Sequence, residues 1–153
     1  MPVRIATTGF DPFAEAAAFA AGRTDMGALV HFVGYCRDAT AGRPVDALYL
    51  EHYAGFTEQE IARFSGEICS RFGISDALII HRVGTLRPGE PIVLVAVLAV
   101  HRAAAFEACG LVMDYLKTDA PLWKKEIGPD GTCWIEPGTA DLAHRAAADR
   151  SYA

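Results

Sequence analysis

The sequence predicts an α+β fold with a mainly antiparallel sheet and three main helices. Three observations support this class. The predicted strands do not alternate regularly with helices, two pairs of neighbouring strands have the spacing of hairpins, and residues 92–100 are nine consecutive apolar residues. Such a run is typical of a central strand that is buried on both faces. With 153 residues, the chain can bury one hydrophobic core without disulfides or a metal.

The first half of the chain begins with a predicted strand at residues 3–8. A helix is expected from Asp11 to about residue 21, because aspartate caps the first free N–H groups and the proline behind it suits the first helical position. Residues 27–36 and 45–53 are predicted to be two strands that pair with each other across a polar loop.

In the second half, Thr57 and Glu60 form a capping-box pattern that starts a helix ending near residue 72. The remaining predicted elements are strands at 77–83 and 92–100, a helix at 102–117, and a hairpin of short strands at 123–126 and 132–136. We expect residues 1–137 to form a single catalytic domain. Residues 138–153 are expected to be a C-terminal tail that is frayed or disordered.

Composition and charge exclude several classes of function. Hydrophobic residues make up 52% of the chain and charged residues 22%, which fits a globular protein. The net charge of -5 argues against a nucleic-acid binder with a basic surface, and no apolar run reaches membrane-spanning length. The N-terminus carries no signal-peptide pattern, so a cytoplasmic location is expected. The four cysteines are widely spaced, and no metal site or cofactor is predicted.

All the lysines of the chain, Lys117, Lys124 and Lys125, lie in one short stretch, and every other basic residue is arginine. Lysine differs from arginine because its pKa can be lowered until the amine acts as a base or nucleophile. The stretch is therefore a candidate catalytic segment; the alternative is a solvated lysine patch in an arginine-biased chain. In an extended segment Lys124 and Lys125 point to opposite faces, so only one of them can share a pocket with Lys117.

A second group of cations lies at the start of the 102–117 helix. His101 and Arg102 face the positive end of the helix dipole, which suggests an anion held there by free backbone N–H groups. Arg37 follows the 27–36 strand, and we expect it to lie opposite Arg102 on the same ligand. The alternatives are that these side chains turn to solvent or pair with acidic residues such as Asp38.

Five motifs carry a resemblance to a known family. They are Gly34–Asp38, His81–Gly84, His101–Ala108, Asp114–Lys117 and Ala120–Glu126. In order and spacing they resemble the molybdopterin synthase catalytic (large) subunit, over about residues 3–136. The resemblance implies an α/β-hammerhead fold and a homodimer. It also implies a heterotetramer in which each end of that dimer binds a ubiquitin-like small subunit ending in a Gly-Gly thiocarboxylate.

The activity implied by the resemblance is the transfer of two sulfur atoms to cyclic pyranopterin monophosphate, which forms the molybdopterin dithiolene in molybdenum cofactor biosynthesis. The resemblance places the catalytic residues at Lys117 and Lys124. The implied substrate-binding residues are Arg37, His101, Arg102, Lys117, Lys124, Lys125 and Glu126. Tyr35 and Cys36, which directly precede Arg37, are also candidate substrate-binding residues, although Cys36 is not part of a pattern that the resemblance carries over. Because the thiocarboxylate supplies the sulfur, this subunit needs only to position the reactants, stabilise charge and move protons.

Two other functions are compatible with the residues themselves. A Schiff-base lyase acting on a phosphorylated carbonyl compound would use Lys117 or Lys124 as its amine. A non-enzymatic adaptor would only capture the C-terminal tail of a ubiquitin-like protein.

Overall fold

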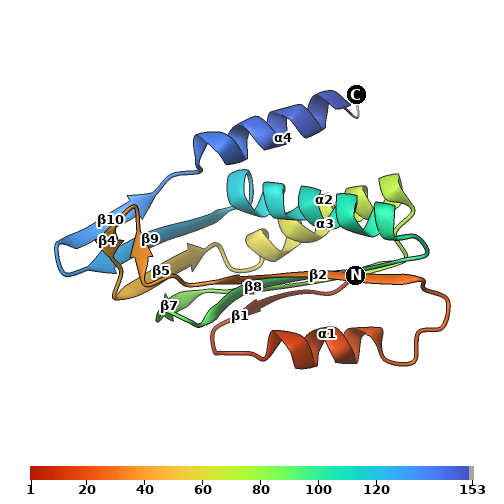
Figure 1. Cartoon of the computed structure of the whole chain (residues 1–153), viewed down its shortest axis with the longest axis horizontal. Helices are drawn as coiled ribbons and strands as arrows, with labels where there is room; N and C mark the ends of the chain where they lie inside the picture. Colours follow the sequence, from red (N-terminus) through yellow and green to blue (C-terminus); the bar gives the residue numbers. More distant parts are fainter. Residues whose placement is uncertain (152–153) are drawn as a thin grey trace.

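The computed structural model describes residues 1–151, and two four-stranded sheets form its framework (Figure 1). The first sheet has the order β1 (Val3–Ala6), β6 (Asp76–Arg82), β8 (Pro91–Ala99) and β2 (Ala28–Tyr35). Only the β1–β6 pair of this sheet is parallel. The predicted class, α+β with mainly antiparallel strands, is therefore confirmed.

The second sheet is antiparallel throughout, and one of its edge strands follows β6 directly after Val83. Its order is β10 (Gly131–Ile135), β9 (Leu122–Gly128), β5 (Ala47–His52) and β7 (Gly84–Leu86). The predicted hairpin near the C-terminus is confirmed as β9 and β10. A small hairpin of β3 (Ala39–Thr40) and β4 (Arg43–Pro44) interrupts the loop that was expected after β2.

The described residues form four helices, one more than predicted, and three of them pack on the first sheet. α1 (Pro12–Ala20) lies on one face, while α2 (Phe56–Phe72) and α3 (Arg102–Thr118) lie on the other (Figure 1). The additional helix, α4 (Thr139–Ser151), runs beside α3, although a frayed or disordered tail was expected for these residues. Residues 152 and 153 of that expected tail lie outside the described residues. No helix between residues 1 and 151 is long and apolar enough to cross a membrane.

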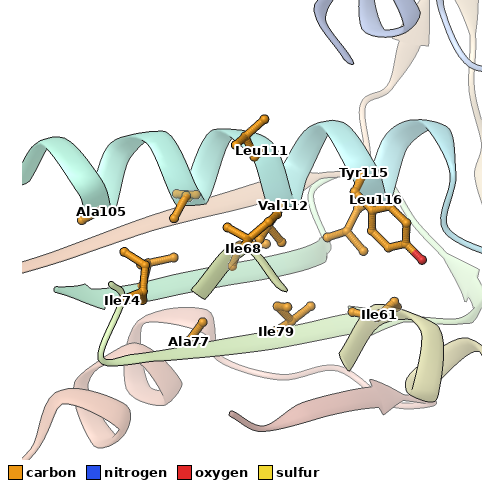
Figure 2. Close-up of a cluster of buried hydrophobic side chains, with 14 of the residues drawn as sticks. Ile61, Ile68, Ile74, Ala77, Ile79, Ala105, Leu111, Val112, Tyr115 and Leu116 are labelled. Carbon is orange, nitrogen blue, oxygen red and sulfur yellow. The ribbon is translucent and has the colours of Figure 1, made fainter. Parts of the chain in front are cut away.

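The core lies between the first sheet and the α2–α3 layer, and β8 occupies its centre. Val93 to Ala99 are all buried, as the uninterrupted apolar run predicted, because helices cover both faces of this strand. Figure 2 shows Ile61 and Ile68 of α2 and Val112 of α3 gathered over Ile79 of β6. The rings of Phe64 and Tyr115 stack at 3.9 Å between centroids and join α2 to α3.

The predicted pairing of strands 27–36 and 45–53 is wrong. β2 pairs with β8, from Ala28 opposite Ala99 to Tyr35 opposite Pro91, whereas β5 pairs with β7 and β9. The loop between them folds into the β3–β4 hairpin, whose turn uses left-handed backbone at Gly42 (φ 78°), and the chain then enters the second sheet. Among the described strands β2 therefore has one partner, and its other edge is unpaired.

Candidate active site

The C-terminal end of α3 meets β9, and this junction brings two lysines together. Lys117 lies in the last turn of α3 and Lys124 is near the start of β9. Between them Pro121 ends the helix. Buried Thr57 of α2 fixes this turn, because its hydroxyl donates to the Pro121 carbonyl at 3.0 Å and accepts from the backbone N–H of Tyr53 at 3.0 Å.

The pKa of the Lys124 amine is lowered from its ordinary value. The largest cause is reduced hydration by surrounding protein atoms, followed by the positive charge of Lys117. Asp141 and Glu126 act in the opposite direction, and Arg37 has the smallest effect, which again lowers the pKa. Lys124 is nevertheless exposed in the single chain, so protein atoms crowd the ammonium without enclosing it. A lowered pKa increases the neutral fraction that a base or nucleophile needs.

Arg37 and Glu126 lie near enough to Lys124 for their charges to act on its amine. Arg37 is exposed in the loop after β2. Glu126 is two residues beyond Lys124, on the same face of β9, and accepts a hydrogen bond from the Thr40 hydroxyl at 2.7 Å.

Tyr35 and Cys36 mark the end of β2. Tyr35 is 44% exposed, whereas Cys36 is buried. Burial raises the pKa of the Cys36 thiol, and the carboxylates of Glu90 and Glu126 raise it further. The thiol is therefore the stable form near neutral pH, and Cys36 is poorly suited to act as a nucleophile.

Lys125 points away from the other two lysines. Its ammonium lies 5.0 Å from the centre of the Tyr49 ring and 5.2 Å from that of Trp134, which are its cross-strand neighbours in β5 and β10. The expected alternation of Lys124 and Lys125 is thus confirmed. The structure does not bring Lys125 to Lys117, although the resemblance placed it among the substrate-binding residues.

His101 and Arg102 lie at the other end of α3. Both are exposed, and His101 makes no side-chain capping bond to the helix. Lys117 lies 15 positions after Arg102, which corresponds to about 22 Å along a helix that rises 1.5 Å per residue. The pairing of Ala28 with Ala99 also puts this end of α3 near the start of β2, while Arg37 follows its end. We had expected Arg37 to lie opposite Arg102, but within a single chain the two residues lie at different ends of β2.

Two residues for which the sequence predicted no role lie close to the lysines. Asp141 of α4 places Oδ1 3.6 Å from Lys117 Nζ; no signal pointed to it, because its segment was expected to be a tail. His81 of β6 is buried, and its Nδ1 lies 2.8 Å from the Arg82 carbonyl oxygen. Because a carbonyl oxygen only accepts, Nδ1 carries the proton. His81 belongs to the His81–Gly84 motif, but nothing in that motif predicted a role for the imidazole.

Burial keeps His81 neutral and should make stability depend on pH. Its pKa is lowered from 6.5 to about 4, mainly by burial, with repulsion from Lys124 and His52 adding to the effect. In the unfolded chain the imidazole regains its ordinary pKa, so the unfolded state binds more protons between these values. We expect the free energy of unfolding to be highest above pH 6.5 and to fall by about 3 kcal/mol as the pH drops towards 4.

Urea unfolding across this pH range would measure the effect. His81→Gln should show a shallower decline than the unsubstituted chain, because glutamine does not titrate. An equal decline in both proteins would assign the pH dependence to other groups.

Comparison with known proteins identifies the family. The family model described as MoaE protein matches residues 6–119. The molybdopterin synthase catalytic subunit of Pseudomonas aeruginosa is 46% identical over 143 residues, which cover 94% of this chain and 95% of the relative. The relative of that name from Caulobacter vibrioides is 47% identical over 142 residues, covering 92% and 93% respectively.

Solved structures agree with these matches. The molybdopterin biosynthesis MoaE protein from Burkholderia ambifaria has a TM-score of 0.77 and 46% identity, with 94% of this chain and 97% of that chain covered. A complex of subunits 1 and 2 of molybdopterin-converting factor from Helicobacter pylori has a TM-score of 0.73 at 18% identity, covering 87% and 89%, and this match shows the fold alone. The chain therefore belongs to the MoaE protein family, whose matched relatives are molybdopterin synthase catalytic subunits.

Proposed function

We propose that this chain transfers sulfur from a thiocarboxylated, ubiquitin-like small subunit to cyclic pyranopterin monophosphate, as the catalytic subunit of molybdopterin synthase. The observation that carries the proposal is the meeting of Lys117 and Lys124 at the junction of α3 and β9, where Lys124 has a lowered pKa. We propose residues 1–137 as the catalytic domain, since both lysines and Arg37 belong to it.

The two lysines can divide the chemistry of this reaction. The thiocarboxylate sulfur is the nucleophile, so the site must handle protons and the charge that develops on the acyl carbonyl. Neutral Lys124 is suited to accept a proton, and the Lys117 ammonium is suited to stabilise negative charge. Arg37 adds a fixed positive charge for the anionic substrate, because its guanidinium remains protonated.

The small subunit is part of the proposal. The Helicobacter pylori structure is a complex of two subunits of molybdopterin-converting factor, which supports pairing of this fold with a second protein. A ubiquitin-like partner would deliver its C-terminal tail to the lysines, because the transferable sulfur is at the end of that tail.

We also propose that a second copy of the chain completes the site. The free edge of β2 exposes Leu29 (38%) and Phe32 (40%), and a strand edge with apolar side chains is suited to pair with another strand. Antiparallel pairing of two β2 strands about a two-fold axis puts the start of one beside the end of the other. Since His101 and Arg102 lie near the start of β2, the second copy would bring its pair towards Arg37.

The proposed reaction can be tested by mixing this chain with cyclic pyranopterin monophosphate and the thiocarboxylated small subunit. Formation of the dithiolene product is expected, and a small subunit ending in an ordinary carboxylate should give none. No product from folded components would overturn the proposal. If borohydride instead trapped a keto substrate on the chain without any partner protein, the Schiff-base lyase would be favoured.

A further inference from the structure

The C-terminal helix α4 is attached to α3 by contacts that are specific in position. Arg145 Nε lies 3.1 Å from Asp119 Oδ2, and its guanidinium carbon lies 5.0 Å from the centre of the Phe64 ring. One residue earlier, His144 Nδ1 lies 3.7 Å from Asp114 Oδ2 of α3. These contacts hold α4 alongside the half of α3 that ends at the catalytic junction.

Asp141 lies one turn before this anchor and on the same face of α4, because residues three and four positions apart are neighbours on a helix. That placement brings its carboxylate to Lys117, at 3.6 Å. An acidic residue in the first turn of a helix is stabilised by the helix dipole, which explains why an acid is tolerated here. The dipole does not explain why Asp141 faces a lysine of the active site.

We propose that Asp141 is a positioning residue of the active site, which holds the Lys117 ammonium beside β9 so that Lys124 is the amine that exchanges protons. The inference rests on the proposed sulfur transfer and deepens it. It makes α4 part of the working site, although this helix lies beyond the proposed catalytic domain. Asp141 acts through the lysines, and no contact with substrate is assigned to it.

The charges around Lys124 come from four parts of the fold. Lys117 of α3 and Arg37 after β2 favour its neutral form, whereas Glu126 of β9 and Asp141 of α4 favour its ammonium form. Removing the carboxylate of Asp141 removes one of the two acids. The Lys124 pKa should then fall further, and the Lys117 side chain should lose its fixed orientation.

The small number of lysines makes a direct test possible. Reductive dimethylation with ¹³C-formaldehyde would label Lys117, Lys124, Lys125 and the N-terminus, and Lys→Arg variants would assign the signals. In Asp141→Asn the Lys124 signal should titrate at lower pH than in the unsubstituted chain. Asp141→Glu keeps the charge, so its Lys124 signal should titrate near the original midpoint. This variant separates the loss of charge from any weakening of α4 that Asp141→Asn causes.

Asp149→Asn is the matched control, because Asp149 is on the same helix and pairs with Arg145. It should leave the Lys124 titration unchanged. An unchanged titration in Asp141→Asn, or an equal shift in Asp149→Asn, would overturn the proposal.

Turnover gives a second readout. In Asp141→Asn the acid limb of the pH–rate profile should move to lower pH, and the maximal rate should fall by about 10-fold because Lys117 is no longer held in place. A maximal rate that fell without movement of the acid limb would point to a merely structural role and would count against the proposal. If the unsubstituted chain made no dithiolene, the proposed function would fail, while the NMR titration would still decide the role of Asp141.

Discussion

Replacing either Lys117 or Lys124 by alanine should lower the rate of dithiolene formation by about 100-fold or more, which is the range for loss of an acid–base group. The expectation follows from their meeting at the α3–β9 junction and from the lowered pKa of Lys124. Single-turnover kinetics with saturating thiocarboxylated small subunit would isolate this step from partner binding.

Arginine at the same positions makes the test sharper, because arginine keeps the charge but cannot lose its proton near neutral pH. Lys124→Arg should be nearly as slow as Lys124→Ala. Lys125→Ala is the matched control: its ammonium lies between the rings of Tyr49 and Trp134 on the opposite face, so its turnover should remain close to that of the unsubstituted chain. Normal turnover in both arginine variants would show that the lysines only bind an anion.

Mixing two impaired variants should restore activity if a second copy completes the site. Arg102→Ala should lose a charge-assisted contact worth about 1.5–3 kcal/mol in kcat/KM, and Lys117→Ala should be slow for the reason given above. In a mixed dimer, one site combines an intact Lys117 from one copy with an intact Arg102 from the other. Random exchange of subunits would make about a quarter of all sites intact, because half of the dimers are mixed and each has one such site.

The control for this experiment is a mixture of Lys117→Ala and Lys124→Ala. Both lysines belong to the same chain's site, so no mixed dimer contains an intact pair and activity should stay low. The complementation assay must allow subunit exchange, which chains carrying different labels can follow, while light scattering measures the oligomeric state. A monomer at micromolar concentration, or no recovery in the Arg102→Ala mixture, would contradict the composite site.

The sequence predicted those elements whose signals are local. The apolar run that became β8 needs burial on both faces wherever it lies, and the alternation of Lys124 and Lys125 follows from any extended segment. The partner of β2 could not be predicted in the same way. Its pairing depends on the β3–β4 hairpin, after which the chain enters the second sheet and does not return along β2. Helix α4 was missed because its stabilising contacts, such as Arg145 with Asp119, lie across the fold.

The site residues also divide into those with a local sequence signal and those whose role depends on the folded chain. Lys117 and Lys124 stood out by composition, since they are two of only three lysines. Asp141 carried no such signal, because an acid near the chain end becomes informative only when α4 is packed on α3. His101 and Arg102 were correctly placed at a helix start, but their distance from Lys117 depends on the whole length of α3.

The length of α3 limits which insertions and deletions the gene can tolerate. α3 carries His101 and Arg102 at one end and Lys117 at the other, with buried residues such as Val112 between them. Inserting or deleting one residue inside α3 would turn one end relative to the other by about 100° and shift it by 1.5 Å. Substitutions on the exposed side of the helix should therefore be tolerated in a library of variants, while single-codon insertions and deletions within α3 should be selected against.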